Sequence, residues 1–449
     1  MKMIYTSTLQ NFAKYLPAPL YVVGGYTRNF LIDGSLSSDI DVCSTLSVED
    51  ILLALEKFGG KAVATYKRTG TVVFVLDGQK YEYTTFRKDG YSAGGKHVPD
   101  QVEFTKDIVE DALRRDFKCN AVYYDLKNDV FVDPLGGIQD IKNKVLDTVK
   151  APKEVFSHDG LRLMRLARFC GELGFSPTEQ VIDGARAFAD NISDVSVERI
   201  WAELKYILSA DTKHPFSPKD GHYRALKILD QTRVLDKILP DLAKGRGLEQ
   251  RKDFHDYDVL EHSLRCVLYA PQKVRICALL HDVAKPLLMV QNGNAYGHEK
   301  VGASMAKEFL KRIKADSETI EKTSRIIRAH MLDMKGDMKE SKVRAFMLEN
   351  VDILEEILQL KQADFSACKD DLRVCPTAIK WREIYQKMLE DGTPFSLADL
   401  KVNATDVMRA GYTGKDIGKT LKDILKLCQT YPEKNQREYL LGKIIAYKK

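Results

Sequence analysis

Two aspartates, Asp39 and Asp41, have the clearest potential for chemistry in this 449-residue sequence. They lie in SDIDVCS (38–44), a short segment with the composition of a strand, whose period of two places both carboxylates on one face. Adjacent carboxylates repel each other, and a divalent cation between them removes the repulsion; Mg²⁺ favours carboxylates combined with substrate phosphates. The alternative is a solvated edge strand whose charges prevent aggregation.

A glycine turn precedes this carboxylate pair. YVVGGYTRNF (21–30) is typical of a strand, a turn at Gly24 and Gly25, and the start of a helix that carries Arg28. Glycines let a backbone approach a phosphate, and a helix N-terminus with an arginine favours negative charge. Glu82, in YEYTTFR (81–87), could supply a third carboxylate, or could simply be exposed.

Two further motifs follow the glycine turn and the carboxylate pair along the sequence. RRDFKCN (114–120) and DPLGGIQD (133–140) follow the first two. The series GG-x-x-R, D-x-D, RRDF-x-x-NA, DP-x-GG-x-x-D resembles the head of the class II tRNA nucleotidyltransferases, the CCA-adding enzymes and bacterial poly(A) polymerases. The resemblance implies that Asp39 and Asp41 hold Mg²⁺ that activates an RNA 3′-hydroxyl and neutralises a triphosphate, releasing pyrophosphate, while Glu82 is a further candidate catalytic carboxylate. It implies nucleotide contacts from Gly24, Gly25, Arg28, Arg115 and Asp116.

A polar series with a period of three follows in FSHDGLRLMRLARFCGELGF (156–175): Asp159, Arg162, Arg165 and Arg168. On a helix this period gives a slanting ridge, which by itself is most often a salt-bridged solvated face. The resemblance instead implies that Asp159 and Arg162 read the pairing edge of CTP or ATP, while the other two arginines contact the triphosphate.

Three positions depart from the family pattern. His158 stands where the family usually has Glu, and Asn29 stands where it usually has Asp after the arginine. The segment YSAGGKHVPD (91–100) is glycine-rich where relatives carry a more charged loop, which is associated with the switch from C to A addition. These positions bear on nucleotide specificity.

Histidines and aspartates form a second ordered series downstream. It comprises His262, His281, Asp282, His298, His330 and Asp364. The order H…HD…H…H…D resembles the HD phosphohydrolase domain. The resemblance implies a primary divalent transition-metal site at His262, His281, Asp282 and Asp364, with His298 and His330 available for a second metal. Its chemistry would be attack of metal-activated water on a phosphate ester, such as an RNA 2′,3′-cyclic phosphate; a degenerate domain kept for its fold is the alternative.

The elements that must position these residues change type along the chain. Five segments are expected as strands: 21–25, 38–44, 71–78, 81–87 and 120–125. Helical periodicity is expected over 48–60, 197–210 and 274–285, and strand signals end near residue 150. We therefore expect an α/β nucleotidyltransferase head with a mixed sheet of about five strands, followed by an all-α neck, body and HD domain. The expected domains are a head (1–145), a neck and body with the nucleotide- and RNA-binding element (146–250), an HD domain (251–370) and a basic helical tail (371–449).

Composition excludes other classes of protein. No apolar run approaches the ~18 residues that span a bilayer, and the N-terminal segment lacks the apolar core of a signal peptide. The eight cysteines are scattered without a C-x-x-C pair, so we expect no disulfide partner and a cytoplasmic setting. The net charge of +5 lies entirely within 371–449, which has 15 basic and 10 acidic residues. This excess suits diffuse contact with a tRNA backbone, or a solvated helical surface.

These observations favour an enzyme that adds C, C and A to the tRNA 3′ end from CTP and ATP. Poly(A) polymerases share the head motifs, and relatives that add only CC or only A remain open. A different class is a metal phosphohydrolase whose head is an RNA-binding platform, but such a platform has no need for a metal-binding carboxylate pair. The oligomeric state and the metal of the second site are left open.

Overall fold

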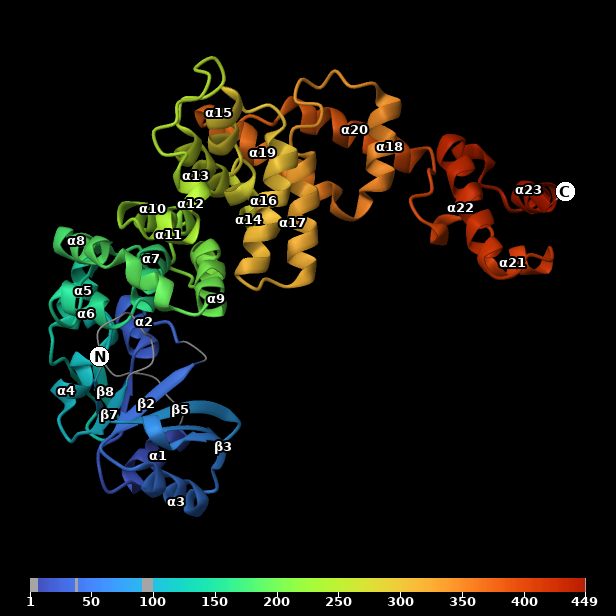
Figure 1. The fold of residues 1–449 in the computed structure, drawn as a ribbon. Helices are drawn as coiled ribbons and strands as arrows, with labels where there is room; N and C mark the ends of the chain where they lie inside the picture. The colour runs from blue at the N-terminus through green and yellow to red at the C-terminus, as the bar shows by residue number, and fades with distance from the viewer. Residues whose placement is uncertain (1–6, 37–38, 91–99, 449) are drawn as a thin grey trace.

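The computed structural model describes residues 7–36, 39–90 and 100–448 of the chain. Figure 1 shows an elongated molecule with an α/β head at the N-terminal end, a helical middle, and three separate helices, α21–α23, at the C-terminal end. The glycine-rich segment at 91–100 lies outside the described residues except for Asp100.

The head is built on a seven-stranded sheet with the strand order β3-β4-β5-β2-β1-β8-β9. Only β2 and β5 pair in parallel, so the sheet is mixed, as expected. Its strands are β1 (Tyr21–Val23), β2 (Ile40–Ser44), β3 (Lys61–Tyr66), β4 (Thr71–Leu76), β5 (Gln79–Thr85), β8 (Tyr123–Asp125) and β9 (Val130–Val132).

The expected count of about five strands is two short. The five expected segments all contribute strands, and β3 and β9 are the additional ones, one at each edge of the sheet. Almost all of β3 is exposed, so it lacks the apolar alternation of a half-buried strand. The other added strand, β9, has only three residues. Edge strands with little burial leave little pattern in the sequence.

Five helices and a hairpin surround the sheet. The helices are α1 (Ser7–Tyr15), α2 (Gly25–Asp33), α3 (Val48–Phe58), α4 (Ile108–Leu113) and α5 (Gly137–Asn143), and the hairpin is β6 (Arg87–Gly90) with β7 (Gln101–Phe104). The helix expected over 48–60 is α3, which begins at a capping box on Ser47 and ends at Gly59 in the left-handed region. Phe12 and Phe74 lie in the core between α1 and the sheet.

The chain is helical after residue 150, apart from a two-residue strand pair, β10 (Val145–Leu146) and β11 (Ser176–Pro177). The neck and body contain α6 (Pro152–His158), α7 (Leu161–Leu173), α8 (Glu179–Ala187), α9 (Val197–Leu208), α10 (Gly221–Gln231), α11 (Val234–Ile238) and α12 (Pro240–Ala243). Nearly every residue of α7 is buried. It crosses α10 closely at Gly171, where a Cβ would lie 2.4 Å from the carbonyl oxygen of Gly221.

The remaining helices carry the downstream histidines and aspartates and the tail. They are α13 (Val259–Tyr269), α14 (Arg275–Leu280), α15 (Lys285–Asn292), α16 (His298–Arg312), α17 (Ser317–Ala329), α18 (Glu340–Glu349), α19 (Leu354–Lys369), α20 (Pro376–Glu390), α21 (Ala404–Arg409), α22 (Lys415–Thr430) and α23 (Arg437–Lys448). The continuous helix expected over 274–285 is wrong, because α14 ends before His281 and α15 begins at Lys285. No helix among the described residues is long and apolar enough to cross a membrane.

The C-terminal helices have a small core of their own. Leu400, Val407, Leu421 and Ile424 belong to it. By contrast, Trp381 of α20 is fully buried in the large core of the body. Phe395, after α20, still packs against the body core, so the residues after Phe395 are the ones that could be removed without opening that core.

Candidate functional site

Three carboxylates meet where β2 and β5 run side by side. Asp41 on β2 is in register with Glu82 on β5, and Asp39 precedes β2 directly. The Asp41 side chain opens onto a cavity, yet the protein around it and the charge of Glu82 raise the pKa of Asp41 to about 6. A carboxylate that is hard to ionise among other carboxylates is stabilised by a divalent cation, so the donor set fits one.

The glycine turn lies directly against these carboxylates. Gly24 has φ of +81°, and a Cβ on it would lie 3.2 Å from Oδ2 of Asp41. Both the left-handed backbone and the close approach therefore favour glycine. Helix α2 begins at Gly25 and carries Arg28 inward, where its Nη1 donates to Oδ1 of Asn120 at 2.6 Å. The turn and helix thus place a buried guanidinium beside the carboxylates.

One cavity of about 780 Å³ collects these groups. All twelve residues expected in the head site line it: Gly24, Gly25, Arg28, Asp39, Asp41, Glu82, Arg115, Asp116, Asp159, Arg162, Arg165 and Arg168. Sequence reasoning missed other residues that line the same cavity, including Arg114, Asn120, Phe169, Arg199, Lys213 and His214. Among the additions, Arg114, Arg199 and Lys213 supply positive charge, which suits a polyanionic ligand.

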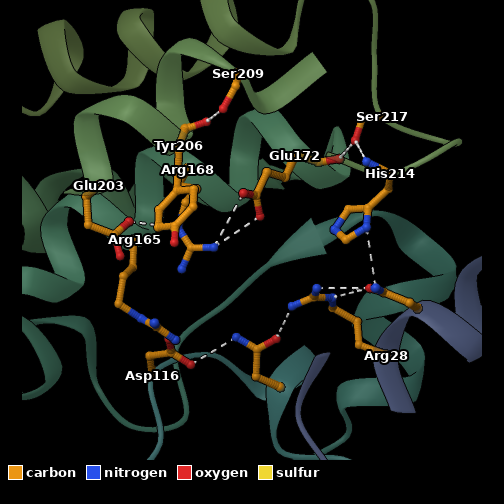
Figure 2. A network of polar contacts seen from close by, with 12 residues as sticks. Arg28, Asp116, Arg165, Arg168, Glu172, Glu203, Tyr206, Ser209, His214 and Ser217 are labelled. Carbon is orange, nitrogen blue, oxygen red and sulfur yellow. Dashed lines mark hydrogen bonds and ion pairs between the residues drawn. The ribbon is translucent and has the colours of Figure 1, made fainter. Parts of the chain in front are cut away.

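The arginines of α7 face inward and not into solvent. Nε of Arg165 donates to Oδ2 of Asp116 at 2.7 Å, and Nε of Arg168 donates to Oε2 of Glu203 at 2.7 Å (Figure 2). Arg165 and Arg168 also lie over the ring of Phe169, at 5.1 and 4.3 Å from its centroid. Although burial opposes it, Arg165 and Asn120 hold the pKa of Asp116 well below its usual range. The arginines do form salt bridges, as expected of a salt-bridged helix face, but they line a wall of the cavity and not a solvated surface.

Asp159 does not lie on the same helix as the arginines, contrary to the expectation. Helix α6 ends at His158 and α7 begins at Leu161, and Asp159 has extended backbone between them. Its Oδ1 accepts from the backbone N–H of Leu161 at 2.9 Å, and its Oδ2 lies 3.7 Å from Nε of Arg162. The acid–guanidinium pair therefore forms at a helix start and still lines the cavity.

A hydrogen-bond chain joins Arg165 on one wall to His214 on another. Asp116 accepts from Asn120 at 3.0 Å, and Asn120 accepts from Arg28. Oδ1 of Asn29 accepts from Nε and Nη2 of Arg28 at 3.1 and 2.9 Å, and its Nδ2 lies 3.5 Å from Nδ1 of His214. Desolvation and the nearby Arg28 lower the pKa of His214 to about 4. This series of hydrogen bonds ties the head to the helical body beside the cavity.

The side chains of the downstream histidine and aspartate series also lie close together. Its six expected members, His262, His281, Asp282, His298, His330 and Asp364, are all buried around one point. Nε2 of His262 lies 3.0 Å from Oδ1 of Asp364 and 3.3 Å from Nε2 of His281. Nε2 of His298 lies 3.2 Å from both Oδ1 of Asp282 and Nε2 of His330. The break between α14 and α15 places His281 and Asp282 at this point.

The orientation of the imidazoles fits a metal centre. Nδ1 of His281, His298 and His330 lies 2.8, 2.9 and 2.6 Å from a backbone carbonyl three residues earlier. These carbonyls assign one ring proton to Nδ1, so the Nε2 atoms face one another and the carboxylates. Although burial opposes it, Asp282 holds the pKa of His281 well above its ordinary value, so a bound cation would take the place of the proton on Nε2 of His281. Desolvation and the neighbouring His281 lower the pKa of His330 to about 3, which keeps its ring neutral as a ligand must be. Facing ring nitrogens and two carboxylates are stabilised together by divalent cations.

Sequence reasoning missed three residues beside this centre. Nζ of Lys285 forms an ion pair with Oδ2 of Asp282 at 2.7 Å. His255 and Cys368 lie beside His262. Lys285 follows His281 and Asp282 directly in HDVAK, so the sequence could have indicated it. His255 lies in a loop and Cys368 at the end of α19, and no sequence spacing links them.

Three family models match successive parts of the chain. They are the poly(A) polymerase head domain over residues 20–147, the "Probable RNA and SrmB-binding site of polymerase A" over 174–245, and the HD domain over 259–365. The fold, the carboxylate cavity and the histidine centre together define a nucleotidyltransferase head joined to a helical RNA-binding region and an HD domain.

Individual relatives agree with this class. An A-adding tRNA nucleotidyltransferase of Deinococcus radiodurans is 28% identical over 79% of this chain and 77% of its own length. A CCA-adding enzyme of Geobacillus kaustophilus is 35% identical, and the alignment covers 50% of this chain and about half (51%) of that enzyme. The crystal structure of Bacillus stearothermophilus CCA-adding enzyme in complex with CTP has the same fold, with a TM-score of 0.65 and 21% identity over 99% of this chain and 98% of that one. In its head, RNA-binding and HD segments the chain is thus similar to tRNA nucleotidyltransferases of the CCA-adding and A-adding kind.

Proposed function

We propose that this enzyme adds C, C and A in order to the 3′ end of tRNA, using CTP and ATP and releasing pyrophosphate. The observation that carries the proposal is the single cavity lined by both the β2–β5 carboxylates and the Asp159–Arg162 pair. Such a cavity has a place for the reacting phosphate at one wall and for the base at another. The names of the relatives, which are CCA-adding and A-adding enzymes, support the same substrates.

The phosphate end of the cavity would do the chemistry. Asp39, Asp41 and Glu82 would hold Mg²⁺, which supplies neutralisation of the triphosphate and activation of the attacking 3′-hydroxyl. The backbone at Gly24 and Gly25 and the guanidinium of Arg28 would bind phosphate oxygens. Arg165 and Arg168 would bind the remaining triphosphate charge. Arg115 and Asp116 would contact the ribose or its phosphates.

The other end would select the base. A carboxylate at Asp159 accepts from the exocyclic amine of C or A, and the guanidinium of Arg162 donates to the ring acceptors beside that amine. Uracil and guanine present a carbonyl at the position of the amine, so the carboxylate rejects both. Both side chains are buried, and a buried polar group that is left unpaired costs about 1–3 kcal/mol.

A-addition alone is the second candidate, because a relative that aligns with 79% of this chain is an A-adding enzyme. The test uses three tRNA transcripts that end before CCA, after C and after CC, each with CTP, ATP or both and Mg²⁺. Ordered extension of all three to CCA supports the proposal. Extension only of the transcript that ends in CC identifies A-addition, and long A tails identify a poly(A) polymerase.

The HD centre is proposed to be a phosphohydrolase that uses a divalent transition metal. The four buried imidazoles among its ligands suit such a metal better than Mg²⁺, which prefers oxygen ligands. The expected activity is hydrolysis of a 2′,3′-cyclic phosphate or a phosphomonoester, with His281 and Asp282 among the ligands. Replacing both by alanine should abolish this activity and leave CCA addition intact; unchanged hydrolysis would refute the assignment.

We also propose that the basic tail contacts the tRNA backbone and that the enzyme works in the cytoplasm, where its eight free thiols stay reduced. Deleting the residues after Phe395 keeps α20 and the aromatic contact of Phe395 with the body core. The deletion should weaken tRNA binding and flatten its salt dependence. An unchanged salt dependence would identify the tail as a solvated surface.

A further inference from the structure

A second group of metal-type side chains adjoins the HD centre and shares His262 with it. His255, His262 and Cys368 each offer one ligand atom, and these atoms all lie within 4.8 Å of one another. The HD family model matches residues 259–365, so His255 and Cys368 both fall outside it. His255 and Cys368 are therefore not part of the ligand set that the HD order defines, whereas His262 belongs to both groups.

The loop that carries His255 is fixed against the end of α19. The backbone N–H of Asp256 donates to the carbonyl oxygen of Cys368 at 3.0 Å. The hydroxyl of Tyr257 donates to Oδ2 of Asp370 at 2.5 Å, and the guanidinium of Arg265 lies 3.9 Å from the centroid of the Tyr257 ring. These contacts hold the imidazole of His255 and the thiol of Cys368 in one place, as a ligand set requires.

Two buried ring nitrogens in this group have no hydrogen-bond partner. Nδ1 of His262 and Nδ1 of His255 are both inaccessible, and neither has a hydrogen-bond partner among residues 7–36, 39–90 and 100–448. His262 itself is fully buried, and its Nε2 faces Asp364, so its Nδ1 lies on the ring edge away from the HD centre. A buried polar atom without a partner costs free energy, and a bound cation removes that cost.

We propose that His255, Cys368 and Nδ1 of His262 form a separate site for a thiophilic divalent cation of the Zn²⁺ and Co²⁺ class. Thiolate and imidazole are the ligands that such cations prefer, and three protein ligands leave one tetrahedral position open. The Cys368 thiol now donates to the carbonyl oxygen of Asp364 at 3.3 Å. Binding would release the thiol proton and the Nδ1 proton of His262 to solvent, and the His262 ring would then bridge this cation and the HD centre.

The test measures metal content and spectrum of the full-length protein. The chelator-treated protein is titrated with Co²⁺, because a thiolate ligand gives a near-ultraviolet sulfur-to-cobalt charge-transfer absorption that nitrogen and oxygen ligands do not give. The wild type should show this absorption. Cys368→Ser and His255→Gln should lose it and should bind one cation fewer by elemental analysis, while the cations of the HD centre remain.

Cys375→Ser is the matched control, because Cys375 is also a free thiol but lies at the start of α20, outside the group. It should keep the charge-transfer absorption. Absorption that persists in Cys368→Ser, or that is absent from the wild type, would overturn the site. If His255→Gln fails to fold by circular dichroism, Cys368→Ser decides alone, since it changes only one partly exposed sulfur atom.

Discussion

The contact between Asn29 and His214 gives a prediction that can be worked out in numbers. Nδ2 of Asn29 lies 3.5 Å from Nδ1 of His214, whose pKa is lowered to about 4 by desolvation and by Arg28. Replacing Asn29 with the family's usual Asp puts a carboxylate at that distance. The negative charge favours the imidazolium, so the pKa of His214 should rise.

The size of the rise follows from Coulomb's law. Opposite unit charges ~4 Å apart attract by about 1 kcal/mol in water and about 4 kcal/mol near a protein surface. Each pKa unit corresponds to ~1.36 kcal/mol, so the expected rise is about 1–3 units. Arg28 already binds the Oδ1 position of residue 29 and would share the new carboxylate, which favours the lower half of this range. His214 would then titrate near pH 5–6.

The assay is a proton NMR titration of the histidine ring signals in the wild type and Asn29→Asp, with His214→Gln to assign the signal. Asn143→Asp is the control, because it makes the same change at an exposed position on α5. Protonated His214 adds positive charge to the nucleotide cavity, so CTP affinity in Asn29→Asp should also rise as the pH falls through the new pKa. A His214 pKa that stays near 4 in Asn29→Asp would refute the reasoning.

Three further predictions concern a carboxylate of the cavity, the packing of the segment next to Asp159, and base selection. The pKa of Asp41 is raised to about 6, so its carboxylate is charged above that pH and protonated below it. The affinity for Mn²⁺, measured by calorimetry, should therefore be lower at pH 5 than at pH 7. Equal affinities at the two pH values would contradict the raised pKa. A Cβ on Gly160 would lie 2.1 Å from the carbonyl oxygen of Asn191, so Gly160→Ala should lower the free energy of unfolding in urea by about 1–3 kcal/mol. The control is Gly418→Ala, at a position on α22 where a Cβ meets no atom, which should leave the free energy of unfolding unchanged or slightly higher. Arg162→Ala should reduce discrimination between CTP and UTP in kcat/KM roughly 10- to 100-fold, the worth of one charged hydrogen bond; unaltered discrimination would exclude Arg162 from base recognition.

Much of the cavity could be predicted because its residues fall in ordered motifs on regular elements. The period of two along β2 gave the paired carboxylates, and Gly24 marked a turn that the structure requires to be glycine. The members of the HD series also meet, although the helix that was to carry His281 and Asp282 is broken there. Residue type and order were therefore better guides than the local conformation.

The features of the sites that could not be predicted depend on contacts between segments far apart in the sequence. His214 reaches Asn29 across 185 positions, and no local pattern connects them. His255 approaches Cys368 only because a loop docks on the end of α19. Asp159 follows the period of three and still lies off the helix, because its side chain accepts from the backbone N–H of Leu161 at the start of α7. Such features depend on tertiary packing, which periodicity does not report.

The central claim is that one cavity joins metal-binding carboxylates to a protein surface that selects C and A. The most direct measurement is pyrophosphate release per molecule of a tRNA transcript that lacks CCA, with CTP, ATP and Mg²⁺, for the wild type and Asp41→Asn. The wild type should release three pyrophosphates per transcript and stop, while Asp41→Asn should bind the transcript and release essentially none. Continued release beyond three, or full release by Asp41→Asn, would contradict the claim.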